Sequence, residues 1–148
     1  MNTLVIYFSA QGTTKTVAEN FARACHYDLF EIQPEEAYSK ADINWKNPLS
    51  RCNKEYFGKK EVPTKGDILN FDSYDKVFIG FPIWYGCAPN VVHSFCQKYN
   101  WQNKDIVAFA TSGGSPIGKT ADKLKPYVEG CKSLEAILVR SEKELINL

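Results

Sequence analysis

The chain has 148 residues, a common length for one domain, and its composition is that of an ordinary soluble globular protein. Its formal net charge is +1, so neither nucleic acid nor an anionic membrane surface is an expected partner. The five cysteines are irregularly spaced and predict neither a disulfide framework nor a metal site. Because we see no signal peptide and no apolar run of membrane-spanning length, we expect one cytoplasmic domain over residues 1–148.

The first 32 residues predict a strand, a helix and a second strand. Residues 3–8 (TLVIYF) are continuously apolar, which is typical of a strand buried on both faces. The stretch KTVAENFARAC has apolar residues at helical spacing, and residues 28–32 (DLFEI) predict the second strand.

Residues 33–75 are polar and irregular, with one helix signal. Asn47 is placed as its N-cap, Pro48 as its first residue and Gly58 just beyond its end. Residues 76–80 (KVFIG) then predict a third strand, and Pro89 opens another helix.

The last third of the chain predicts two further strands, at residues 105–110 and 134–139. A helix ending near Gly130 lies between them, and a short last helix follows, with Ser141 and Glu144 spaced as a capping box. Strands that alternate with helices predict an α/β fold with a doubly wound, five-stranded parallel sheet. Ligands of such sheets bind at the carboxyl ends of the strands, here the loops after the first, third and fourth strands.

Residues 113–120 (GGSPIGKT) match the phosphate-binding loop of nucleotide hydrolases. The match follows the fourth strand, whereas such a loop normally follows the first, and Pro116 removes a backbone N–H that this kind of loop needs. The later strand ends at Arg140, where a magnesium-binding acid is required. A nucleophile elbow centred on Ser115 also fails, because Ile117 replaces its last glycine. We therefore set both interpretations aside.

A better phosphate site lies between the first strand and the first helix. Ser9, Thr13 and Thr14 offer hydroxyl groups, and Gly12 permits close approach of the backbone. The free N–H groups and the positive dipole end of the helix point to the same place, although a simple cap of the helix would use the same residues.

The two other loops predict a place for a planar ring. In PIWYG (residues 82–86), Trp84 and Tyr85 offer flat faces for stacking, and packing beneath a neighbouring loop is the alternative. TSGGS (residues 111–115) is rich in glycine and permits close approach to a ring edge. A phosphate site and an aromatic shelf at one crevice fit an aromatic mononucleotide.

Three stretches, YFSAQGTTKTVAENFA, YDKVFIGFPIWYGCAPNVVHSF and VAFATSGGSPIG, together resemble the flavodoxin family in its short-chain, flavodoxin-like branch. The resemblance covers nearly the whole chain and implies FMN as cofactor and the strand order 2-1-3-4-5. It places the phosphate on Ser9, Gln11, Gly12, Thr13 and Thr14, and the flavin ring on Pro82, Ile83, Trp84, Tyr85 and Gly86 and on Thr111, Ser112, Gly113 and Gly114.

The chain departs from the family pattern in two places. Gln11 and Thr13 replace the usual Thr and Asn of the phosphate loop, but both side chains can still form hydrogen bonds. The second ring loop has no aromatic residue, which leaves one flavin face open. The resemblance also implies that a carbonyl of the Tyr85–Gly86 region accepts a hydrogen bond from flavin N5–H.

The function implied is an FMN-binding electron carrier that exchanges electrons with a redox partner protein or a small acceptor. An FMN-dependent NAD(P)H:quinone-type reductase is the alternative, and an interaction domain without flavin is a third. No side chain need act as a catalytic acid or base. The short last helix allows a monomer or a homodimer.

The remaining candidates have structural interpretations. His26 and His93 are expected on the surface, and Cys87 as a small packed residue. Trp45, Tyr56 and Phe57 are expected to cover the sheet, although their segment could also line the open flavin face.

Overall fold

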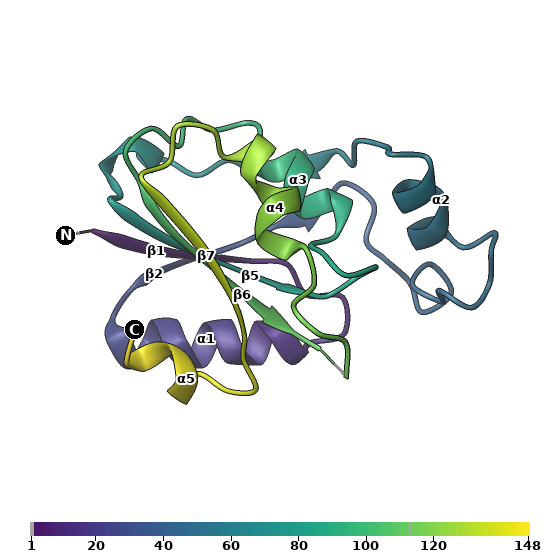
Figure 1. Cartoon of the computed structure of the whole chain (residues 1–148), viewed down its shortest axis with the longest axis horizontal. Coiled ribbons are helices and arrows are strands. Elements are labelled where there is room, and N and C mark those ends of the chain that lie inside the picture. Colours follow the sequence, from purple (N-terminus) through teal and green to yellow (C-terminus); the bar gives the residue numbers. More distant parts are fainter. Residues whose placement is uncertain (1, 113) are drawn as a thin grey trace.

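The computed structural model describes residues 2–112 and 114–148, and its centre is a parallel sheet (Figure 1). The strands of this sheet are β1 (Thr3–Tyr7), β2 (Asp28–Glu31), β5 (Lys76–Pro82), β6 (Asp105–Thr111) and β7 (Ser133–Leu138), in the order β2-β1-β5-β6-β7. Counted along the chain, this is the expected order 2-1-3-4-5. The expected α/β class and the five-stranded doubly wound sheet are therefore confirmed.

Helices cover both faces of the sheet. In Figure 1, α1 (Thr13–Cys25) and α5 (Lys143–Ile146) lie on one face, and α3 (Asn90–Cys96) and α4 (Thr120–Leu124) lie on the other. Two short 3-10 helices, Phe71–Ser73 and Lys125–Tyr127, complete this second layer.

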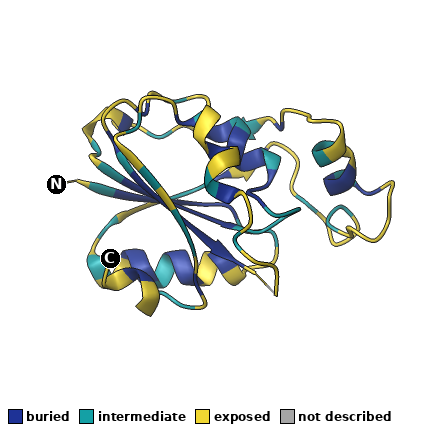
Figure 2. Ribbon diagram, viewed as in Figure 1, coloured by how far each residue is buried: buried dark blue, intermediate teal, exposed yellow. Residues whose placement is uncertain are grey.

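Alternate residues of β1 serve two separate cores, because successive side chains of a strand point to opposite faces. Leu4 and Ile6 pack in the core beneath α3 and α4, whereas Val5 and Tyr7 pack in the core beneath α1. All four are buried, which explains why the strand is a continuous apolar run instead of an alternating one. Figure 2 shows the same burial along the central strands.

A long excursion between β2 and β5 projects beyond the sheet. It carries a small antiparallel pair, β3 (Gln33–Pro34) with β4 (Thr64–Lys65), and the helix α2 (Arg51–Phe57). In Figure 2 this segment is mostly exposed or half-buried. No helix among the described residues has the length and apolarity needed to span a membrane.

The expected start of the helix in this excursion is wrong. Its N-cap is Ser50 instead of Asn47, and Gly58 follows its last residue as expected. Asn47 uses its side-chain oxygen to accept the N–H of Leu49 at 3.0 Å, which closes a local turn. Pro48 therefore belongs to that turn and not to the helix.

Two further boundaries differ from the expectation. The helix after β6 shortens to α4 and continues as the 3-10 helix Lys125–Tyr127, which contains a proline. At α5 the capping box does not form as predicted: the Glu144 carboxylate accepts the N–H of Arg140 at 2.7 Å, and Ser141 Oγ accepts the N–H of Lys143 at 3.3 Å. Each of these two side chains therefore accepts the N–H of the residue before the one that a capping box over Ser141 and Glu144 would use.

Candidate functional site

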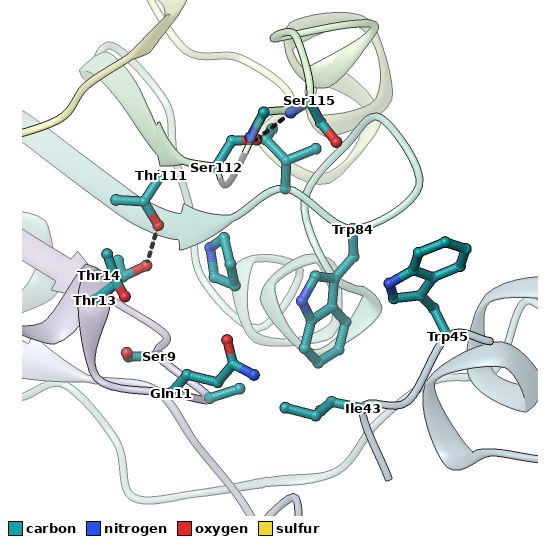
Figure 3. Close-up of a pocket in the computed structure, with 14 residues that line it drawn as sticks. Ser9, Gln11, Thr13, Thr14, Ile43, Trp45, Trp84, Thr111, Ser112 and Ser115 are labelled. Carbon is teal, nitrogen blue, oxygen red and sulfur yellow. Dashed lines mark hydrogen bonds between the residues drawn. The ribbon is translucent and has the colours of Figure 1, made fainter. Parts of the chain in front are cut away.

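A pocket of about 560 Å³ opens at the carboxyl ends of β1, β5 and β6 (Figure 3). The three loops that topology predicts supply most of its wall, and the excursion supplies the remainder. Its lining residues are Ser9, Ala10, Gln11, Thr13, Thr14, Ile43, Trp45, Pro82, Ile83, Trp84, Thr111, Ser112, Gly114 and Ser115.

One end of the pocket is the N-terminus of α1. Gly12 has φ +94°, a left-handed conformation that a side chain would strain, and its N–H donates to Ser9 Oγ at 3.0 Å. The N–H groups of Thr13, Thr14 and Lys15 have no acceptor among the described residues. Three free donors at the positive end of a 13-residue helix form a natural anion site.

A buried hydrogen bond joins this anion site to the neighbouring strand end. The hydroxyls of Thr14 and Thr111 lie 2.7 Å apart, and both residues are buried (Figure 3). This bond fixes the first turn of α1 against β6, so the free N–H groups are held in place before any ligand binds.

The other end of the pocket is built by a tight hairpin after β5. Trp84 and Cys87 exchange two backbone hydrogen bonds, and Tyr85 and Gly86 have φ of +58° and +77°, the positive pair typical of a type I′ turn. The Trp84 indole lines the pocket and is held by an edge contact with Phe8, whose ring centroid is 5.7 Å away. It offers the aromatic surface that the sequence predicts.

Tyr85 lies elsewhere than the sequence suggests. It does not line this pocket but a smaller hollow beside it, and its ring stacks on Tyr56, with 4.2 Å between the centroids, while its hydroxyl donates to Asn53 Oδ1. Burial, then the contact with Cys52, raises the pKa of its phenol, which stays neutral. Tyr85 therefore joins the hairpin to the excursion instead of offering a second stacking face.

Gly86 also lies outside the pocket lining. Its carbonyl accepts the N–H of Lys119 at 3.1 Å, which joins the loops after β5 and β6. At Gly118 a Cβ atom would lie 2.6 Å from this same carbonyl oxygen, so the close approach of the loops depends on glycine there. Lys119 itself does not line the pocket, as expected for an accidental match to the hydrolase motif.

The loop after β6 folds around one side chain. Ser112 Oγ accepts the N–H groups of Gly114 at 3.1 Å and Ser115 at 2.6 Å. Gly114 has φ +150° with no atom near its missing Cβ, so its backbone is accessible to a ligand. The predicted residue Gly113 lies outside the described residues, and Ser115 lines the pocket although the sequence did not suggest it as a binding residue.

Ile43 and Trp45 also line the pocket, although the sequence suggested no role for Ile43 and favoured a sheet-covering role for Trp45. The expectation that Trp45, Tyr56 and Phe57 cover the sheet is wrong, and the position of Trp45 fits the alternative that their segment lines the site. Trp45 lines the pocket, Tyr56 packs on the hairpin, and Phe57 is 72% exposed. A hollow of about 310 Å³ adjoins the pocket and shares both Ile43 and Trp45 with it. The sequence feature that could have identified this part of the wall is Trp45 itself, an aromatic residue in an otherwise polar, irregular segment.

His93 is buried, contrary to the expectation of a surface residue. Its ring stacks on Tyr127 with 4.5 Å between centroids, and its Nε2 has no hydrogen-bond partner among the described residues. Burial, aided by the positive charge of Lys123, lowers its pKa to about 4. His26 is exposed and Cys87 is buried, as expected.

The geometry suits a ligand with an anionic group at one end and a planar ring at the other. The chain matches the Flavodoxin family model over residues 2–146. It is 36% identical to a protein assigned as a flavoprotein from Bacteroides eggerthii, with 99% of this chain and 98% of that chain covered and a TM-score of 0.85. A similar protein from Bacteroides uniformis is 31% identical, with 99% and 96% covered and a TM-score of 0.87.

A flavoprotein from Lactobacillus acidophilus, solved in complex with FMN, shares the fold at 20% identity, with 99% and 96% covered and a TM-score of 0.77. No curated protein matches the chain. The family match over nearly all of the sequence, together with the two relatives above 30% identity, establishes that this chain belongs to the flavodoxin family.

Proposed function

We propose that the protein is an FMN-binding, flavodoxin-like electron carrier. The observation that carries the proposal is the pocket itself, in which three free N–H groups and an indole ring lie at opposite ends. Membership in the flavodoxin family supports FMN as the cofactor, as does the FMN complex of the Lactobacillus acidophilus neighbour.

The residues present fit FMN at both ends. The backbone of Thr13, Thr14 and Lys15 would hold the phosphate, with the hydroxyls of Ser9 and Thr13 beside it. Among the described residues that line the pocket there is no lysine or arginine, so helix N–H groups and hydroxyls would stabilise the phosphate.

Trp84 and the backbone around Gly114 would hold the ring. When bound, FMN supplies the one- and two-electron redox chemistry, and the protein orients the ring and limits its contact with water. Of the two carbonyls in the Tyr85–Gly86 region, that of Gly86 already accepts the N–H of Lys119, whereas that of Tyr85 has no partner among the described residues. The Tyr85 carbonyl is therefore our candidate for this contact.

A second candidate function is an FMN-dependent NAD(P)H:quinone-type reductase. The hollow of about 310 Å³ beside Trp84 favours it, because a planar acceptor would have room there. The near-neutral charge points the same way, because electrostatic docking to a charged redox protein would be weak.

We propose a cytoplasmic protein, a monomer or a homodimer, that exchanges electrons with a partner protein or a small acceptor. All five cysteines are free, as is usual in a reducing compartment. An interaction domain without flavin is the third possibility.

Anaerobic stepwise reduction of the purified protein, followed by absorption, tests the proposal. An electron carrier should show two separable one-electron steps and no direct reaction with NADPH. Rapid bleaching of the flavin by NADPH, with a single two-electron step, would favour the reductase instead. A protein that stays colourless after addition of FMN would refute both.

A further inference from the structure

We propose that Trp45 forms a second aromatic wall of the flavin site, and that Asn53 is the positioning residue that holds this wall against the Trp84 hairpin. The proposal rests on the proposed FMN function and identifies what covers the second face of the ring. It concerns a segment, residues 43–53, that the loops after the strands do not include.

Asn53 connects three separate pieces of chain. Its side chain is buried, and its Nδ2 donates to the carbonyls of Trp45 at 2.9 Å and Asn47 at 2.7 Å. Its Oδ1 accepts the hydroxyl of Tyr85 from the hairpin. Both amide protons and the amide oxygen are therefore used, and the position of the Trp45 backbone is tied to that of the hairpin.

The hairpin end of this connection is itself constrained. Tyr85 is a non-glycine residue with φ +58°, and its ring stacks nearly parallel on Tyr56 of α2, at an interplanar angle of 14°. Because Tyr85 directly follows Trp84, a shift of the hairpin moves Trp84 and the Tyr85 hydroxyl together. The hydrogen bond to Asn53 passes that shift to Trp45.

A second set of contacts holds the base of the excursion. Arg51 forms an ion pair with Glu55 at 2.8 Å and lies over the ring of Tyr38, with 4.0 Å between the guanidinium carbon and the ring centroid. Tyr38 in turn packs edge-on against Trp84, with 5.3 Å between the centroids. The base of the excursion is thus anchored independently of Asn53, so loss of the Asn53 contacts should displace the Trp45 loop without unfolding the segment.

Trp45 has little packing of its own. It is 67% exposed, although it lines both the pocket and the adjoining hollow. In Figure 3 its indole lies at the same end of the pocket as that of Trp84. A flat ligand that contacted both indoles would bury this apolar surface, which accounts for a tryptophan at an otherwise exposed position.

The first test compares FMN affinity in Trp45→Ala and in Leu49→Ala. Leu49 is a suitable control because it is 73% exposed in the same segment and does not line the pocket. Loss of one aromatic stacking partner should weaken FMN binding about 5- to 150-fold. The dissociation constant of ribose 5-phosphate, measured by its competition with FMN, should not change, because this compound reaches only the phosphate end. An FMN dissociation constant within about twofold of the parent for Trp45→Ala would overturn the proposal.

The second test examines the positioning role of Asn53. Asn53→Asp removes the two N–H donors, whereas Tyr85→Phe removes the hydroxyl on the hairpin side. Each should weaken FMN binding in the parent protein and have little further effect in a Trp45→Ala background, because all act through the same wall. Full additivity in both double variants would show that Asn53 does not act through Trp45.

If Asn53→Asp does not fold, as judged by circular dichroism, Tyr85→Phe alone carries the second test. If the parent protein binds no FMN, the proposed function fails and this proposal fails with it. If the parent binds FMN and Trp45→Ala binds it equally well, only the second wall is refuted.

Discussion

Substitution of Gly118 by alanine should destabilise the protein more than the same substitution at Gly86. Both residues are left-handed, with φ of +57° and +77°, so each alanine costs about 1–2 kcal/mol in backbone strain. At Gly86 a Cβ meets nothing within 4 Å, whereas at Gly118 it would lie 2.6 Å from the Gly86 carbonyl oxygen. This oxygen belongs to the backbone and cannot rotate away.

The overlap at Gly118 adds a cost of about 1–3 kcal/mol, typical of forcing an extra methyl group into a packed position. Relief of the overlap would lengthen the hydrogen bond from the Lys119 N–H to the Gly86 carbonyl, now 3.1 Å. We expect Gly118→Ala to be less stable than Gly86→Ala by about 1–3 kcal/mol, measured by urea unfolding of the flavin-free protein. Equal urea midpoints and equal denaturant slopes for the two variants would show that the close approach of these loops does not depend on glycine at position 118.

Three other predictions concern residues outside the pocket lining. The pKa of His93 is about 4 in the folded protein and about 6.5 in the unfolded chain, so only the unfolded chain takes up this proton between the two pH values. The free energy of unfolding should therefore fall as the pH is lowered from about 6.5 to about 4. The loss is on the order of 3 kcal/mol, and His93→Phe should abolish most of it in urea titrations at pH 7 and pH 4. Lys104 is buried and its ammonium donates to three carbonyls, including that of Tyr74 at 2.6 Å, so Lys104→Met should cost about 1–3 kcal/mol by thermal unfolding. Lys119→Ala should leave the FMN dissociation constant nearly unchanged, and a large loss would restore the phosphate-loop interpretation of residues 113–120.

The sequence predicted the sheet well because its central strands are buried on both faces. A continuous apolar run as short as residues 3–8 is typical of a buried strand, and alternation with helices then fixes a parallel sheet. The three site loops followed from topology alone, because parallel strands end at the same edge. Of the predicted binding residues that the structure describes, most line the pocket.

The features that the sequence did not predict depend on tertiary packing, which no local sequence pattern encodes. His93 follows Val91 and Val92 and lies off their stripe, but Tyr127 covers that side of α3. The direction of Tyr85 depends on a partner 32 positions away in the chain. The path of the excursion that brings Trp45 to the pocket is set by such side-chain contacts, and its residues have no regular period.

The central claim is tested most directly by titrating the flavin-free protein with FMN and with riboflavin and following the quenching of flavin fluorescence. Riboflavin lacks the phosphate that would meet the free N–H groups of Thr13, Thr14 and Lys15. We predict one FMN site per chain, with riboflavin bound at least about tenfold more weakly because hydrogen bonds to a charged group contribute about 1.5–3 kcal/mol. Equal affinity for the two flavins, or no quenching by either, would contradict the account.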